Sequence, residues 1–261
     1  MEEPPPRAEP PTEAPKAPRT SLAARLLNVF AVPGDVFEEV KTAPASVVNW
    51  LVPIALLALV GAVSAVIIFS QPAIQQKMRE DQAKMVDKKV EAGKMTREQA
   101  DQYLALVDKL MGPAVLKIAG AVGAVIASAV RVVWWAFILW LLGWRLLKVR
   151  FGFPKALEAA GLATMISVLG TIVTLLLTVN LARLFATPSL ALVISDFDAT
   201  RKSHLFLGAV NIFSVWFIGV TSVGLSKLAG VPFLRAAFLV FAVWVLQDSL
   251  FILSGLGQFA L

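Results

Sequence analysis

Long apolar runs alternate with short polar connections along most of this chain. About 20 apolar residues are enough for a helix to cross a hydrocarbon core about 30 Å thick. Five runs reach this length, so the pattern predicts an all-α integral membrane protein with five transmembrane helices. We place them near Trp50–Phe69, Ile118–Trp144, Ala159–Leu184, Leu205–Leu225 and Phe233–Leu256.

The chain before the first run divides into two parts. Residues 1–20 are rich in proline and glutamate, a composition that predicts a disordered tail. Between residues 21 and 48, apolar residues recur at helical spacing and predict two short amphipathic helices, which Pro33 and Gly34 separate. Such helices suit the membrane interface. Packing under the membrane helices is the alternative.

A polar stretch from residue 71 to 112 separates the first two runs within the membrane domain at residues 49–258. Its apolar residues fall on two helical faces, with a break from Gly93 to Thr96. Thr96 and Gln99 form a capping box, which starts a helix. We therefore predict a helical hairpin that projects into water. It is either a solvated structural arm or a surface that binds a partner.

The composition fits a membrane protein, because 57% of residues are hydrophobic and 16% are charged, against about 25% charged in soluble domains. The basic residues behind the net charge of +6 therefore indicate which connections lie on the inner side of the membrane, and we expect no nucleic-acid partner. Basic residues crowd the second connection, whereas the hairpin's eight bases are nearly cancelled by seven acids. We predict a cytoplasmic (inner) membrane protein with its N-terminus inside and its C-terminus outside.

Three polar residues stand out within the predicted membrane helices: Arg131, Asp248 and Asn211. Ionisable groups there are costly unless they are paired or hydrated, so they are functional candidates. Arg131 and Asp248 either form an ion pair that fixes helix register, line a polar path, or make no contact. Arg131 shares a helical stripe with small residues that mark a helix contact, in one bundle or a homodimer: Gly120, Ala124 and Ser128.

Catalytic chemistry finds little support in this sequence. The chain has no cysteine and a single histidine, His204, and it lacks nucleophile-elbow, zinc-protease and phosphate-loop motifs. Asp196 and Asp198 near His204 are a weak cation signal without fixed spacing. We expect no enzyme, no metal and no cofactor.

Four short segments resemble the Yip domain family, the Ypt/Rab-interacting polytopic membrane proteins. They are PGDVFEEVK at 33–41, FGFPKAL at 151–157, NIFSVW at 211–216, and GLS at 224–226 followed by LRAA at 234–237. Pro33, Phe37, Trp216 and Gly224 are the residues that carry the likeness. The resemblance implies five membrane helices with a cytosolic N-terminal region. It also implies binding of small GTPases in eukaryotic relatives, whereas this chain resembles the prokaryotic-type members.

Two functions follow from these observations. The first is a membrane-organising or partner-binding protein, with the lipid bilayer, other membrane proteins or further copies of itself as partners. The long hairpin and the plain Pro/Glu tail argue against binding of a small GTPase. The second is a small solute or ion transporter, or a channel, whose path is lined by Arg131, Asp248 and Asn211.

Overall fold

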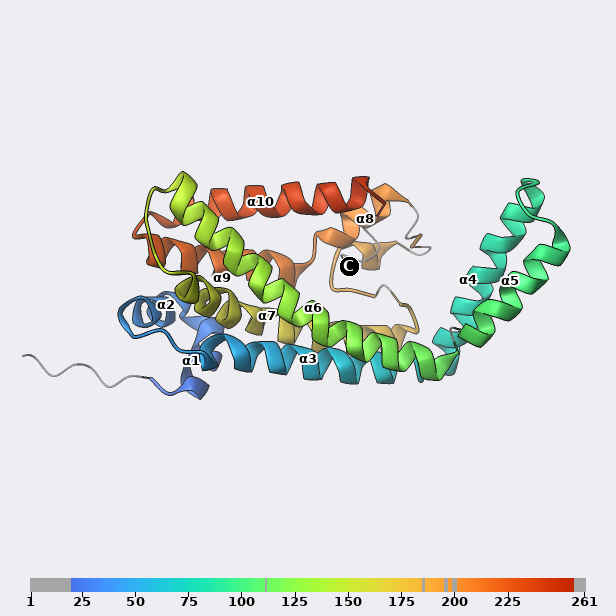
Figure 1. Ribbon diagram of the computed structural model, residues 1–261, viewed down its shortest axis with the longest axis horizontal. Helices are drawn as coiled ribbons and strands as arrows, with labels where there is room; N and C mark the ends of the chain where they lie inside the picture. Colours follow the sequence, from blue (N-terminus) through green and yellow to red (C-terminus); the bar gives the residue numbers. More distant parts are fainter. Residues whose placement is uncertain (1–19, 111, 185, 195–196, 199–200, 256–261) are drawn as a thin grey trace, which may run out of the picture.

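The computed structural model describes residues 20–110, 112–184, 186–194, 197–198 and 201–255, and this part of the chain is almost entirely helical (Figure 1). All but Thr20 of the predicted disordered tail lies outside the described residues. The helices are α1 (Leu22–Ala31), α2 (Pro33–Thr42), α3 (Val48–Ile68), α4 (Pro72–Glu91), α5 (Arg97–Leu110), α6 (Pro113–Leu141), α7 (Phe153–Leu181), α8 (Lys202–Ala209), α9 (Ile212–Ala229) and α10 (Phe233–Leu253), with a π-helical turn η1 (Leu142–Leu146) and a 3-10 turn η2 (Leu190–Val193).

Five of these helices are long and apolar enough to cross a membrane, which confirms the predicted fold class: α3, α6, α7, α9 and α10. They run along the long axis of the molecule, with α1 and α2 at one end and the hairpin at the other (Figure 1). We call these the α1–α2 end and the hairpin end. The first, second, third and fifth helices match their predicted spans, although α7 begins six residues earlier than expected, with Pro154 in its first turn.

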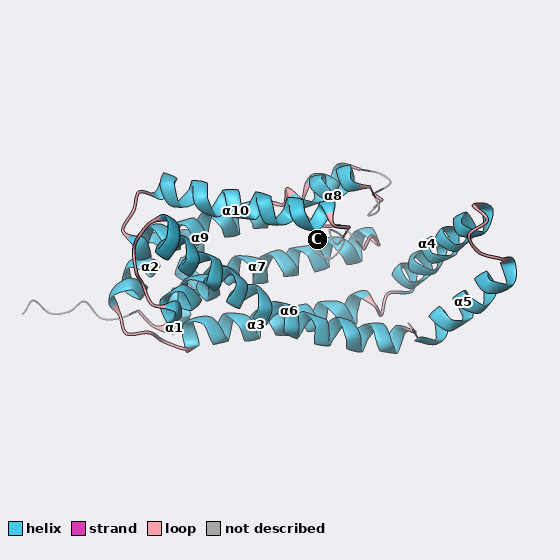
Figure 2. Ribbon diagram, turned by 45° about the horizontal axis from the view of Figure 1, so that its top comes forward, coloured by secondary structure: helices cyan, strands magenta, loops and turns pink. Residues whose placement is uncertain are grey.

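The α4–α5 hairpin projects from the end of the bundle in both views (Figures 1 and 2). The predicted capping box starts α5: the Thr96 N–H donates to Gln99 Oε1 at 2.9 Å, and the Gln99 N–H donates to Thr96 Oγ1 at 3.2 Å. Exposed ion pairs join the two helices and the turn, at 3.0 Å for Arg97–Asp87 and 3.8 Å for Arg79–Asp108. Local signals in the sequence therefore specify this hairpin.

Depth in the bundle can be followed along α7. Near its start Gly161 packs directly on Trp50 at the beginning of α3, and nine residues later Gly170 packs on Phe213 at the beginning of α9. Nine residues of helix rise about 14 Å, and the 21 residues of α3 rise about 31 Å. Thus α9 begins near half the depth of the bundle.

The fourth crossing is therefore broken, and the predicted continuous helix at Leu205–Leu225 is wrong. Helix α8 ends at Ala209 and α9 starts at Ile212. Between them the backbone forms an isolated antiparallel bridge from Asn211 to Ser189. The Leu190 N–H also donates to Val210 O, and the Ile212 N–H donates to Pro188 O. These bonds replace the helical ones that a continuous helix would make at this point.

Helices α1 and α2 pack under the bundle, against α7 and α9. Their apolar faces are buried in the same core as the membrane helices, through Val29, Val36, Phe37 and Val40. The amphipathic pattern therefore has a protein partner at its apolar face, as the second sequence interpretation expected.

Candidate functional site

A cavity of about 250 Å³ lies at the break in the fourth crossing. About 10–15 Å³ is enough to hold one water molecule, so the cavity has room for several waters or a small polar ligand. Its lining is unusually polar for the middle of a membrane bundle: Arg131, Ser167, Gly170, Thr171, Thr174, Thr187, Gly208, Ala209, Asn211, Phe213, Ser214 and Asp248.

The three polar residues singled out in the sequence thus line one cavity. Arg131 comes from the middle of α6, Asp248 from the second half of α10, and Asn211 from the break itself. Discontinuous helices near the midplane are a common way to build a binding site in a membrane protein, because their free backbone groups face a cavity and not lipid.

Arg131 and Asp248 do not form a direct ion pair. Among the described residues, none of the ion pairs within 4.0 Å includes either side chain. The guanidinium of Arg131 instead lies over the ring of Phe217 on α9, 4.9 Å from its centroid, a cation–π contact. Asp248 is half-buried and interacts with the Trp244 side chain one turn earlier on α10. The two charges therefore face the same cavity with space between them.

Asn211 has a structural task at the cavity wall. Its side-chain Oδ1 accepts the Phe213 N–H at 2.9 Å, so it caps the first turn of α9. Its side chain therefore caps the start of α9, whereas the sequence analysis placed Asn211 inside a continuous membrane helix.

The hydroxyl groups on α7 add further polarity to the cavity. The Thr171 hydroxyl donates to Ser167 O at 2.9 Å. The Ser167 Oγ atom is buried and has no hydrogen-bond partner within the described part of the chain. Thr187 and Ser189 share a hydroxyl contact of 2.9 Å on the segment before the break. An unpartnered buried hydroxyl is costly unless water or a ligand satisfies it.

Arg131 on α6 and Asp248 on α10 both line the cavity. Helix α10 packs on α9 and α8, and Trp134 Nε1 of α6 donates to Gln247 Oε1 of α10 at 2.6 Å. Arg131 and Trp134 are accordingly exposed on the side of α6 next to this bond.

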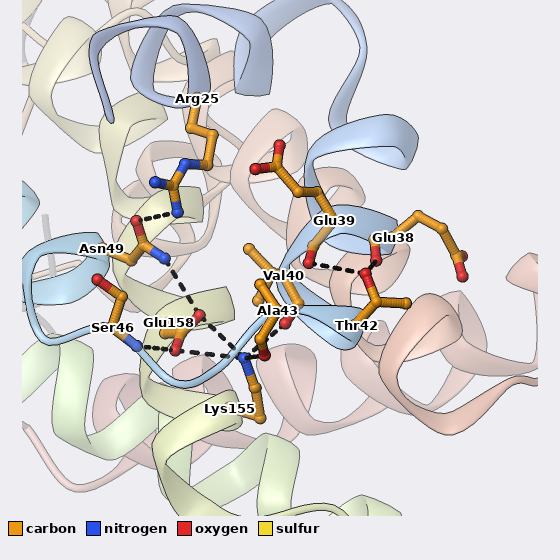
Figure 3. A network of polar contacts seen from close by, with 10 residues as sticks. All are labelled: Arg25, Glu38, Glu39, Val40, Thr42, Ala43, Ser46, Asn49, Lys155 and Glu158. Carbon is orange, nitrogen blue, oxygen red and sulfur yellow. Dashed lines mark hydrogen bonds and ion pairs between the residues drawn. The ribbon is translucent and has the colours of Figure 1, made fainter. Parts of the chain in front are cut away.

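A second polar cluster, which the sequence analysis missed, lies at the α1–α2 end (Figure 3). Glu158 on α7 is 1% exposed and accepts the Ser46 N–H at 2.5 Å and the Asn49 side-chain amide at 3.1 Å. Lys155 donates to the carbonyls of Val40 and Ala43 at 2.6 and 2.7 Å.

The ion pair within this cluster spans 3.5 Å from Lys155 Nζ to Glu158 Oε2. Arg25 on α1 joins through a 2.8 Å bond from Nη1 to Asn49 Oδ1. Buried charges need an opposite charge and hydrogen bonds, because removing one member of a buried ion pair leaves the other charge unpaired. The cluster therefore ties α1, the end of α2 and the start of α3 to α7. The lysine and glutamate three residues apart were its only local signal in the sequence.

The small-residue stripe of α6 faces α3 of the same chain. A Cβ atom at Gly120 would lie 2.9 Å from the Cβ of Ala65, and one at Gly61 would lie 2.9 Å from the Cβ of Ala124. Ser128 is 4% exposed and donates to Ala124 O at 2.7 Å. The stripe thus forms the close α3–α6 contact inside one chain.

The residues that carry the family likeness lie on α2 and α9. Phe37 is fully buried, and its ring lies 3.4 Å from where Gly224 would carry a Cβ. Pro33 opens α2 at its first position. Trp216 on α9 stacks edge-on with Phe30 of α1 at 5.8 Å between centroids. Phe37 and Gly224 therefore pack between α2 and α9, and Trp216 packs between α9 and α1.

The structure gives no support to a cation site at Asp196, Asp198 and His204. Within the described residues, no group of three histidine, cysteine or acidic side chains could hold a metal ion. Asp196 lies outside the described residues. His204 Nδ1 accepts the Asp198 N–H at 3.0 Å.

The comparisons with known proteins identify one family. The family model of the Yip1 domain matches residues 27–256, nearly the whole chain. No curated protein and no solved structure matches the chain significantly.

Proposed function

Because the chain belongs to the Yip1 domain family of multi-pass membrane proteins, we propose that it acts by binding other membrane proteins or further copies of itself, without catalysing a reaction. The hairpin is the observation that carries this proposal. It stands off the bundle, and among the hairpin side chains that the structure describes, three large apolar ones are exposed between charged residues: Met85 at 54%, Tyr103 at 43% and Leu106 at 53%. A helical surface of this kind suits a protein partner outside the membrane.

Proximity crosslinking in membranes tests this role. Leu106→Glu places a charge on the exposed apolar surface without disturbing the hairpin core, and we expect it to remove crosslinked partners. Glu98→Gln on the exposed face of α5 is the matched control and should keep them. If Leu106→Glu and deletion of residues 71–112 both keep every partner, the hairpin is not the docking surface. A small GTPase is not among the partners we propose.

For orientation, we propose a cytoplasmic (inner) membrane with the α1–α2 end inside and the hairpin end outside. The argument is the charge of the second connection, which lies at the α1–α2 end next to the Lys155 cluster and carries Arg145, Lys148 and Arg150. Labelling of single cysteines placed at residues 94 and 148 with an impermeant reagent tests it, because the chain has no native cysteine. If only the cysteine at residue 148 is labelled in intact cells, the orientation is the opposite of the one that we propose.

The cavity favours a second candidate function, the transport of a small solute or ion. Its polar lining, the broken fourth crossing and the charges of Arg131 and Asp248 are features of a path through a membrane. Flux into vesicles that contain the purified chain tests it. Loss of flux in Arg131→Gln and Asp248→Asn, with folding intact, would support transport, and no flux in the unaltered chain would exclude it for the solute used.

A further inference from the structure

We propose that the cavity between α6 and α10 binds a small zwitterion in which a phosphate or carboxylate is joined to a primary ammonium group, such as the headgroup of phosphatidylethanolamine. The inference shares with the second candidate function only the cavity in which the ligand binds. It concerns binding, and it holds whether or not the ligand is transported.

The charges of the cavity argue for a zwitterion. Arg131 and Asp248 both line it, one positive and one negative, and no ion pair within 4.0 Å joins them in the part of the chain that the structure describes. A net anion would satisfy Arg131 but face Asp248, and a net cation would do the reverse. A ligand that carries both charges satisfies both residues at once, which matters most where water is scarce.

The shape of each charged group narrows the chemistry further. A guanidinium presents a planar set of donors that matches a phosphate or carboxylate, so Arg131 would hold the anionic end. A carboxylate needs N–H donors to satisfy its oxygens, and a primary ammonium supplies three. A quaternary ammonium supplies none, so Asp248 should prefer ethanolamine to choline.

The remaining polar groups fit the same ligand. The Ser167 hydroxyl on the cavity wall has no partner among the described residues. Ser214 in the first turn of α9 lines the cavity too, where the positive end of the helix dipole favours an anion. These groups lie on the same cavity as Arg131, so the anionic end would have donors from several elements.

The exposure of Arg131 gives the ligand its route. Arg131 and Trp134 are both exposed on α6, and Trp134 Nε1 donates to Gln247 Oε1 of α10. A headgroup could reach Arg131 from the bilayer while its acyl chains stay in lipid. A free zwitterion of the same chemistry could also reach the cavity from water, so the test must separate the two sources.

Native mass spectrometry of the delipidated full chain in detergent provides the test. The probes are short-chain phosphatidylethanolamine, phosphatidylcholine and phosphatidylglycerol, and free phosphoethanolamine. We expect phosphatidylethanolamine to bind about tenfold or more tightly than the other two lipids, the scale of one charge-assisted hydrogen bond. Free phosphoethanolamine that binds alone, without the lipid, would support the zwitterion site and identify a soluble source. Equal binding of all three lipids with none of free phosphoethanolamine would overturn the proposal.

Matched variants locate the site. Arg131→Gln and Asp248→Asn should each weaken binding of the preferred zwitterion about tenfold, whereas Lys117→Gln on the same helix α6 and Asp101→Asn on the hairpin should leave it unchanged. If the cavity variants fail to fold, a phosphatidylethanolamine with a photoreactive headgroup replaces them in the unaltered chain. Crosslinks confined to α6 and α10 near these residues support the site. Crosslinks spread over all lipid-facing helices would show that the cavity holds only water and that the lipid contacts are ordinary ones, and this result would overturn the proposal.

Discussion

The ring of Phe37 on α2 lies against the backbone of Gly224 on α9, where a Cβ atom would stand 3.4 Å from the ring carbon Cζ. Phe37 is fully buried. The contact joins the first short helices to the membrane bundle, and both partners belong to the segments that carry the family likeness. The likeness therefore marks a packing interface between the N-terminal helices and the fourth crossing.

Replacement of Phe37 by alanine should release α2 from α9. We expect a loss of about 3–5 kcal/mol in the free energy of unfolding, the usual cost of removing a buried phenylalanine. Chemical unfolding in detergent, followed by tryptophan fluorescence, measures it. Leu27→Ala on neighbouring α1 is the control, because Leu27 is 69% exposed and should cost less than about 0.5 kcal/mol. Equal effects of the two variants would contradict a docked α2.

Local patterns in the sequence were enough for most of the fold. Apolar length identified the membrane helices, Pro33 marked the boundary between α1 and α2, and Thr96 with Gln99 located the start of α5. Each of these signals acts within a few residues, so it can be recognised in one chain.

Long-range contacts account for what the sequence did not predict. The break at Asn211 depends on a backbone bridge to Ser189, and the surrounding apolar run gives no sign of it. The bonds from Glu158 to Ser46 and Asn49 join residues more than one hundred positions apart. The sequence analysis identified Arg131 and Asp248 as candidates, but the distance between the two side chains depends on how α6 and α10 pack in the bundle.

Replacement of Glu158 by alanine tests the buried cluster at the α1–α2 end. It leaves Lys155 without its carboxylate and the Ser46 N–H without its acceptor. We expect a loss of about 3–5 kcal/mol, as for one member of a buried ion pair. Thermal unfolding of the purified chain in detergent measures it. Glu98→Ala on the exposed face of α5 should leave the transition unchanged, and a Glu158→Ala protein as stable as that control would show that the cluster contributes nothing.

The cap at the break in the fourth crossing is tested at Asn211. Asn211→Ala removes the acceptor of the Phe213 N–H, and we expect it to cost about 0.5–2 kcal/mol. Asn211→Ser keeps a capping oxygen and should restore most of the loss. Chemical unfolding in detergent compares the two variants. A gain in stability for Asn211→Ala would mean that α8 and α9 prefer to join into one helix, against the broken crossing.

Variants at the close contact between α3 and α6 test whether the small-residue stripe packs inside one chain or forms a dimer. A Cβ at Gly120 would lie 2.9 Å from Ala65 and 3.0 Å from the ring of Phe69, whereas one at Gly123, on the exposed side of α6, would meet nothing within 4 Å. Gly120→Val should therefore cost about 1–3 kcal/mol through overpacking, and Gly123→Val should cost little. Both variants should keep the oligomeric state of the unaltered chain by light scattering after gel filtration. A Gly120→Val protein that keeps its stability but changes its oligomeric state would place the stripe at a homodimer interface.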